Sequence, residues 1–302
     1  MADIRRIDLN LLAALDALLD ERNVTRAAAR LALTQPTLSG MLERLRDLFG
    51  DPLFVREQRG VLPTPYAQSL APRVKQLLAD AAALVAKEPF VPSKAEGVFS
   101  ISVNDYMQSA LMVPFAAELR RLAPRMRLAI YPLVIEGLGP RLAQGEFDLA
   151  VTIPEFSWPQ AHARLLYRER YVCAVRARHP LKGGTVSLTD FCRYDHVLVS
   201  PTGGAFEGPA DAALTRKRMR RRVALSVPSF LVLTELLQVD DLVAVVPEKL
   251  VRRRSRGLRV FAPPIEVPGF DVVAVWHPRM HQDPAHRWMR ELLATVAGRM
   301  GT

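Results

Sequence analysis

A short polar segment near the amino terminus carries residue types that can hydrogen-bond to nucleic acid. It begins a predicted helix whose apolar residues occupy the other face, so the polar side chains face away from the apolar stripe. Glutamine can pair bidentately with adenine, and serine or threonine hydroxyls can donate to bases or phosphates. Further along the same helix, Arg44 can reach a phosphate. The residues at the helix start are Gln35, Pro36, Thr37 and Ser39.

Predicted helices in the first 60 residues position these side chains. Apolar residues recur at helical spacing over 8–22, Asn23 breaks that helix, and Thr25 is expected to cap a short second one. A third helix begins at Gln35, and Gly50 ends it. Two short helices joined by a tight turn form a helix-turn-helix, whose second helix enters the major groove at its start. A small helical core with a solvated face is the alternative.

A small two-stranded wing is predicted at 53–56 and 60–61, directly after this helix-turn-helix. Arg56 and Arg59 lie on it and can enter the adjacent minor groove or clamp the backbone. The sequence therefore offers a second set of DNA contacts beside the helix start.

A long amphipathic helix is predicted from 65 to 87. Spacings of three and four alternate along its apolar face, as in a coiled-coil seam of three heptads. We expect it to self-associate, with packing on its own domain as the alternative, and Pro72 is expected to kink it. The seam residues are Ala67, Leu70, Val74, Leu77, Ala81 and Leu84.

Strands and helices alternate after a proline-containing linker at 89–97. This order predicts an α/β fold with a mostly parallel sheet in two lobes, whose ligands bind beyond the carboxyl ends of strands. Helix amino termini there offer free N–H groups to a carboxylate or phosphate. Strands are predicted at 98–103, 127–135, 147–153, 171–175, 197–200, 223–227, 242–246 and 272–276, and helices at 107–122 and 138–144.

Composition bounds the class of protein. The 302 residues suggest two domains, and the net charge of +10 raises nucleic acid or an anionic ligand as partner. However, residues 1–60 hold nine arginines and nine acidic residues, so the charge surplus lies almost entirely after residue 90. We expect no signal peptide and no membrane span. Cys173 and Cys192 fit a reducing cytoplasm as buried small hydrophobes.

The stretch VTRAAARLALTQPTLSGMLERLRDLFGDPLFVR, followed by a glycine and PTPYA, resembles the amino-terminal domain of LysR-type transcriptional regulators. The match covers the first 90 or so residues closely, and the length and α/β remainder fit the same family. The resemblance implies a winged helix-turn-helix at 1–64, a linker and dimerisation helix at 65–88, and a periplasmic-binding-protein-like effector domain at 89–302. Lobe I would comprise 96–161 and 268–302, and lobe II 162–267.

The same resemblance implies a function. The protein would bind an operator in double-stranded DNA as a homodimer or homotetramer, contact RNA polymerase, and activate or repress promoters in response to a small-molecule effector. It would be cytoplasmic, need no cofactor or metal, and not be an enzyme. The residues implied at the DNA are Thr25, Gln35, Pro36, Thr37, Ser39, Arg44 and Arg56, with Arg59 added from its place on the wing.

The effector is expected between the lobes. Shorter motifs, among them RYVC at 170–173 and VPSF at 227–230, resemble the branch of nodulation and aromatic-compound regulators. Candidate lining residues at strand ends and helix starts are Asn104, Asp105, Tyr106, Thr152, Ile153, Pro154, Ser200, Pro201, Thr202, Gly203, Ser229 and Phe230. Arg253 falls where salicylate-type members place an arginine near the ligand.

Two departures from that branch disfavour salicylate. Glu169 stands where those members carry a histidine, and a carboxylate there repels an anion unless Arg168 or Arg253 pairs with it. The loop 202–208 also lacks a histidine found in salicylate responders. A neutral or larger aromatic, stacked by Tyr106 and Phe230, is the expected alternative.

Several other features carry weaker hypotheses. The basic runs at 216–222 and 252–256 resemble nucleic-acid patches, but a solvated face is the preferred interpretation. The histidines at 277, 281 and 286 lack an acidic companion, which argues against a metal site. A second class of function is a small-molecule binding protein or enzyme with an incidental helical amino terminus. That class predicts a monomer without sequence-specific DNA binding.

Overall fold

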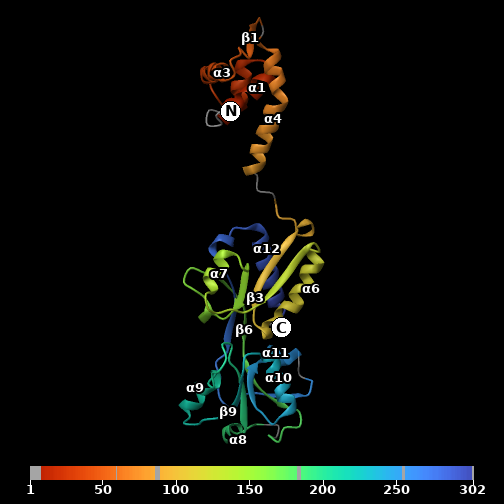
Figure 1. Cartoon of the computed structure of the whole chain (residues 1–302), viewed down its shortest axis with the longest axis vertical. Coiled ribbons are helices and arrows are strands. Elements are labelled where there is room, and N and C mark those ends of the chain that lie inside the picture. The colour runs from red at the N-terminus through yellow and green to blue at the C-terminus, as the bar shows by residue number, and fades with distance from the viewer. Residues whose placement is uncertain (1–7, 59, 86–88, 182–184, 254–255, 301–302) are drawn as a thin grey trace. The chain divides into compact units, whose positions relative to one another are not determined.

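The computed structural model describes residues 8–58, 60–85, 89–181, 185–253 and 256–300 (Figure 1). The side chain of Arg253 lies outside this description. The chain divides into two compact units, Met1–Pro89 and Phe90–Thr302.

The first unit is a helical domain with a β-hairpin. Its elements are α1 (Leu9–Glu21), α2 (Val24–Arg30), α3 (Gln35–Phe49), β1 (Phe54–Glu57), β2 (Gly60–Pro63) and α4 (Pro65–Val85). Thr34 caps α3, and Gly50 ends it with a φ of 63°. The expectation that Thr25 caps α2 is wrong. Asn23 is the cap, because its extended backbone lets its side chain accept from the N–H of Arg26 at 3.0 Å, and Thr25 lies inside the helix.

Helix α4 uses part of its apolar seam inside its own unit. Ala67 and Val74 are buried in the core that α1 and α3 form, and Leu70 packs against that core. In contrast, the side chains of Leu77 and Leu84 are 44% and 88% exposed. The first half of the seam therefore packs within its own unit, and the second half is exposed, so self-association stays a prediction. The helix continues through Pro72.

The second unit contains two lobes, each built around a sheet. In lobe I the strand order is β4-β3-β5-β12-β6. Figure 1 shows α6 and α12 beside this sheet. The elements of lobe I are β3 (Gly97–Val103), α5 (Asp105–Met107), a π-helical segment (Gln108–Met112), α6 (Val113–Leu122), β4 (Met126–Pro132), α7 (Leu138–Gln144), β5 (Leu149–Thr152), β6 (His162–Glu169), β12 (Phe270–Trp276) and α12 (Pro284–Gly298).

Lobe II has an antiparallel sheet β10-β7-β11 and a parallel pair β8-β9. A single bridge between His196 and Val243 connects the two sets of strands. The elements of lobe II are β7 (Tyr171–Arg176), α8 (Leu188–Arg193), β8 (Asp195–Val199), α9 (Pro209–Arg216), β9 (Arg222–Val227), α10 (Phe230–Val239), β10 (Ala244–Pro247), α11 (Glu248–Arg253) and β11 (Leu258–Phe261).

The expectation of a mostly parallel sheet is wrong. Among the described strands only β3–β4, β3–β5 and β8–β9 pair in parallel, whereas β12 runs antiparallel to both β5 and β6. Strands β6 and β11 escaped prediction because their residues mix polar and apolar types without a clear alternation. Since β6 pairs with β12 along its length, residues 162–169 belong to the sheet of lobe I rather than to lobe II.

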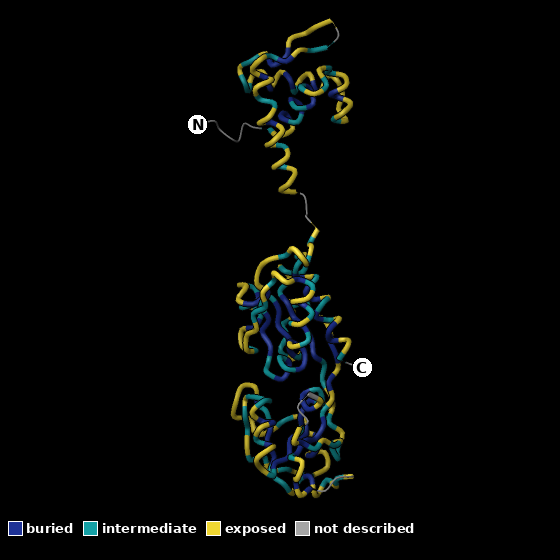
Figure 2. Tube along the Cα trace, turned by 90° about the vertical axis from the view of Figure 1, so that its right-hand side faces the viewer, coloured by how far each residue is buried: buried dark blue, intermediate teal, exposed yellow. Residues whose placement is uncertain are grey.

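Burial follows these sheets. Figure 2 shows buried backbone running through the interior of each lobe, with exposed residues at the loops. One core cluster spans both lobes, joining residues of β3 and α6 with residues of β7, α10 and β10. The chain therefore holds the lobes together through packed side chains as well as through the strands that cross between them.

Candidate functional site

The start of α3 presents its polar residues to solvent. Gln35, Pro36, Thr37 and Ser39 are all exposed, while Leu38 and Leu42 on the opposite face are buried. Amino-terminal residues of a recognition helix contact base edges in this motif. The four predicted side chains are therefore open to solvent, on the side of α3 away from its buried residues.

Two of the predicted DNA contacts already have partners within the unit. The hydroxyls of Thr37 and Thr34 lie 2.8 Å apart, and Arg44 Nη2 lies 3.3 Å from Asp8 Oδ2. Thr25 on α2 and Arg56 on β1 are exposed, and Arg59 lies outside the described residues. Any contact that Arg44 makes with a phosphate must compete with its ion pair to Asp8.

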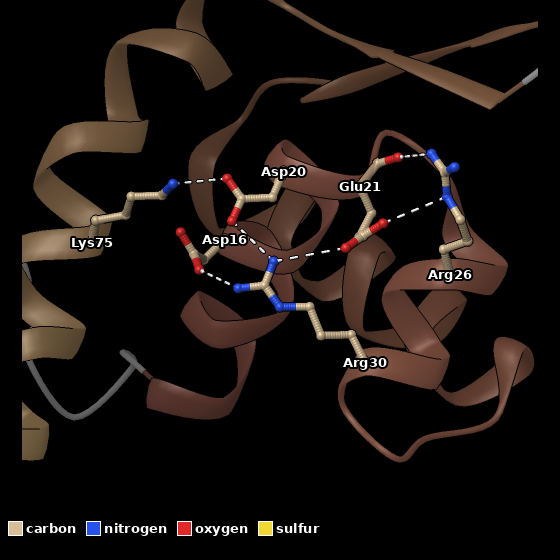
Figure 3. Close-up of polar contacts among 6 residues, drawn as sticks. All are labelled: Asp16, Asp20, Glu21, Arg26, Arg30 and Lys75. Atoms are coloured by element: carbon tan, nitrogen blue, oxygen red, sulfur yellow. Dashed lines mark hydrogen bonds and ion pairs between the residues drawn. The ribbon is translucent and has the colours of Figure 1, made fainter.

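Charged residues join α1, α2 and α4 (Figure 3). Arg30 on α2 and Lys75 on α4 both bind Asp20 on α1, at 2.9 and 2.7 Å. Hydrogen bonds from Lys75 and then Arg30 lower the pKa of Asp20. Arg30 also reaches Asp16, and Arg26 pairs with Glu21. This network ties α1 to both α2 and α4.

A cavity of about 550 Å³ lies between the two lobes. That volume suits a small organic ligand. Its lining includes aromatic side chains from both lobes, and the rings of Tyr106 and Phe230 lie 5.6 Å apart at a tilt of 56°. Of the predicted effector residues, those that line it are Asn104, Tyr106, Thr152, Ile153, Ser200, Pro201, Thr202 and Phe230.

Other predicted effector residues do not line this cavity. Asp105 in lobe I instead accepts hydrogen bonds from Ser229 Oγ at 2.7 Å and from the N–H of Leu231 at 3.1 Å, both in lobe II. Pro154 and Gly203 also lie outside the lining, and nothing is described for the side chain of Arg253. Asp105 therefore joins the lobes rather than facing the ligand space.

Glu169 is buried where the chain crosses from β6 to β7. Its carboxylate accepts from the Tyr106 hydroxyl and from the N–H of Arg170 at 2.9 Å, and Lys249 Nζ lies 3.9 Å away. Arg168, an expected partner, pairs with Asp271 instead. Burial, with help from neighbouring Tyr167 and Glu169, raises the pKa of Tyr106, which therefore stays protonated. Glu169 does not line the cavity, but it binds Tyr106, which does.

Sequence reasoning missed Arg221, because the run 216–222 was interpreted as a solvated face. Arg221 lines the cavity, and its side chain is only 1% exposed. Its Nε and Nη2 donate to the two carboxylate oxygens of Asp211, at 2.9 and 2.6 Å. No spacing in the sequence marks this residue, because Asp211 lies on a different element.

The expectation of free helix amino termini at this edge is also wrong for several N–H groups. The side chains of Asn104, Asp105, Asp211 and Ser229 accept from N–H groups at the starts of α5, α9 and α10. The chain caps itself where a ligand carboxylate was expected to bind.

Two further searches concern only the described residues. No group of three or more His, Cys, Asp or Glu is placed to hold a metal ion. In the same described part of the chain, no helix is long and apolar enough to cross a membrane.

Comparison with known families identifies both units. Residues 9–68 match the bacterial regulatory helix-turn-helix proteins of the lysR family, and residues 92–298 match the LysR substrate binding domain. The chain belongs to the LysR family. The resemblance in the amino-terminal motif is thereby confirmed, together with the α/β fold that combines a helix-turn-helix and an effector-type domain.

This LysR-type regulator has relatives that match it from end to end. It is 34% identical over 298 residues to the transcriptional activator NagR of a Ralstonia species, covering 97% of this chain and 98% of that protein. It is 35% identical over 294 residues to the transcriptional activator NahR of Pseudomonas putida, covering 96% and 98%. Nodulation protein D 3 of Rhizobium leguminosarum is 32% identical, covering 97% and 98%.

Solved structures of transcriptional regulators share this fold. A probable transcriptional regulator from Pseudomonas aeruginosa superposes with a TM-score of 0.61 at 31% identity, covering 96% of this chain and 97% of that one. Full-length CbnR in complex with its target DNA gives a TM-score of 0.55 at 16% identity, covering 96% and 100%, which shows the shared fold alone. This chain is a DNA-binding transcriptional regulator of the LysR type.

Proposed function

We propose that this regulator reads its operator with the start of α3 and the wing, and that a small aromatic effector in the cavity between the lobes changes operator binding. The observation that carries the proposal is the cavity itself, which is lined from both lobes and walled by aromatic rings. The proposal is supported by two relatives that match this chain over nearly their full length and are named as transcriptional activators.

Two contacts connect the cavity wall to the packing of the lobes. Tyr106 lines the cavity and binds Glu169 at the crossover between lobes, and its neighbour Asp105 binds the start of α10. A ligand that moves the Tyr106 ring therefore acts on both connections. A ligand that binds one lobe arrangement better than another shifts the population toward that arrangement.

Substitution of Gln35 tests the DNA-reading role. Gln35→Ala should weaken specific operator binding by about 1–3 kcal/mol and relax base preference at one position. The measurement is a titration of full-length protein on operator and scrambled DNA. Gln68→Ala, which removes an exposed glutamine on α4, is the control and should bind as the wild type does. Unchanged operator affinity of the Gln35 variant would remove that residue from the proposed interface.

The remaining assignments follow from the same role. We infer that the protein acts in the cytoplasm as a homodimer or homotetramer, contacts RNA polymerase, and is not an enzyme. The exposed second half of α4 supports self-association, and the names of its relatives as regulators support a non-enzymatic role.

A further inference from the structure

The charges around the cavity are unusual for a site that would bind an anion. Among the described residues that line it, Arg221 is the only one with a positive charge, and Asp211 already holds its guanidinium through two hydrogen bonds. The third nitrogen of that guanidinium, Nη1, lies 3.3 Å from His196 Nδ1. A ligand carboxylate would therefore find its counter-charge taken.

Several backbone donors near the cavity are taken as well. Asp105 accepts from the N–H of Leu231, and Ser229 accepts from that of Val232, so these two N–H groups at the start of α10 are satisfied by the chain itself. Asp211 does the same for Gly208 at the start of α9. Helix amino termini bind anions when their N–H groups are free, and these are occupied.

The remaining charges of the lining are negative. Glu155 and Glu207 line the cavity, and both residues are exposed to solvent. A carboxylate entering the cavity would lose water without gaining a cation, a change that costs free energy. An uncharged ligand avoids this cost.

One polar group in the wall is without a partner. Thr152 is buried at the end of β5, lines the cavity, and its hydroxyl oxygen has no hydrogen-bond partner among the described residues. Buried polar groups are nearly always satisfied, so an unpaired one on a residue that lines a cavity indicates a place for a ligand atom. A threonine hydroxyl can donate to a carbonyl or accept from a hydroxyl or amide.

We propose, resting on the proposed function, that the cavity selects an uncharged aromatic ligand with a carbonyl, amide or hydroxyl group for Thr152, and rejects aromatic carboxylates. Arg221 lies in the wall with its charge neutralised by Asp211 behind it, and the aromatic rings supply apolar contact. Selectivity then arises from the absence of an available counter-charge for the anion.

Matched pairs of probes test the proposal on the full-length protein. Binding constants at neutral pH are measured by calorimetry for benzamide and benzoate, cinnamamide and cinnamate, and 2-naphthamide and 2-naphthoate. We expect the amide of at least one pair to bind about tenfold or more tightly than its carboxylate, the scale of one unsatisfied buried polar group. Failure of every amide to bind, or a carboxylate that binds at least as tightly as its amide, would overturn the proposal.

Charge variants test the assigned cause. Asp211→Asn leaves Arg221 unpaired, so benzoate should bind about tenfold more tightly than to the wild type. Asp241→Asn, which removes the partner of Arg176 outside the cavity lining, is the matched control and should leave benzoate affinity unchanged. An Asp211 variant that folds yet gains no benzoate affinity contradicts the proposal.

Two further variants keep the test decisive if the Asp211 variant does not fold. The double change Glu155→Gln and Glu207→Gln should raise benzoate affinity about threefold, an amount typical of exposed charges. Thr152→Val should weaken the best amide about tenfold. Glu235→Gln, an exposed charge change outside the lining, is the control. Unchanged affinities in both Glu155/Glu207 and Thr152 variants would overturn the proposal.

The outcome is separable from the proposed function. A protein that binds its operator and responds to an aromatic carboxylate would keep the regulatory role and lose the ligand class assigned here. A protein that fails to bind any operator would lose the regulatory role whatever its ligand preference.

Discussion

At the scale of single residues, lobe II contains a histidine whose protonation state is set by its neighbours. The ring of His196 is buried, and its Nε2 lies 2.9 Å from the carbonyl oxygen of Phe191. Because a carbonyl only accepts and the Arg221 guanidinium only donates, Nε2 carries the hydrogen and Nδ1 accepts. Burial and then the nearby Arg221 charge lower the pKa of His196 to about 4.

This shift predicts a pH dependence of stability. Below pH 6.5, the usual histidine pKa, the His196 side chain of the unfolded protein binds a proton. In the folded protein the same side chain binds that proton only near pH 4. The free energy of unfolding should therefore fall as the pH drops between these values, with about 2–3 kcal/mol of loss near pH 4.5. The loss stops below the folded pKa, where both states are protonated.

Urea unfolding of the wild type and His196→Gln at pH 7.5 and pH 4.5 measures this contribution. All three tryptophans lie in the second unit, at 158, 276 and 288, so their fluorescence reports on the correct domain. The variant should lose less stability than the wild type between the two pH values. Equal losses in both proteins would show that His196 does not carry the effect.

At the scale of elements, α4 divides its apolar surface between two uses. Ala67 and Val74 are fixed in the core of the first unit, and Lys75 binds Asp20 on α1. Beyond this point Leu77, Leu84 and Val85 remain exposed. The first half of the helix is therefore held by its own unit, and the second half offers the surface expected to bind another copy.

Substitution within that second half should separate association from folding. Leu84→Asp should shift the full-length protein to a smaller species at micromolar concentration, because burying one leucine contributes about 1.5–3 kcal/mol to an interface and a carboxylate opposes it. Light scattering after size exclusion gives the mass, and circular dichroism checks that folding is unchanged. Val239→Asp, at a side chain 80% exposed on α10, is the control. A Leu84 variant with the wild-type mass would place the interface elsewhere.

At the scale of the whole molecule, polar contacts among the described residues add to the packed core that joins the two lobes of the second unit. Strands β6 and β7 carry the chain from one lobe to the other, and Glu169 lies at that crossing, bound by Tyr106. The carboxylate of Asp105 adds a separate connection to α10. Motion of the lobes must therefore stretch or break specific hydrogen bonds.

Loss of the Asp105 connection should be visible in hydrogen exchange. Asp105→Ala removes the acceptor of the Leu231 N–H, at a cost of about 1–2 kcal/mol, so amides at the start of α10 should exchange faster. Exchange in β3, inside the five-stranded sheet, should stay unchanged. Asp190→Ala, which removes a contact with Ser187 inside lobe II, is the control. Unaltered exchange at 229–233 would show that Asp105 does not hold α10.

Features that depend only on neighbours along the chain could be predicted from the amino-acid sequence. The end of α3 at Gly50, the apolar faces of α1 and α3, and the heptad pattern of α4 are local, and the structure has these helices where their patterns placed them. The register of the helix-turn-helix motif is local as well, and this is why the family could be identified from it.

The tertiary structure decided what depends on distant partners. The direction of β12, the pairing of β6 with lobe I, and the use of Asp105 as a cap for α10 follow from chain segments that meet only after folding. The same is true of Arg221, which was one arginine in a basic run until folding placed it against Asp211 in the wall of a cavity. A sequence gives only the number of charged residues. The charge that is available to a ligand depends on which ion pairs form when the chain folds.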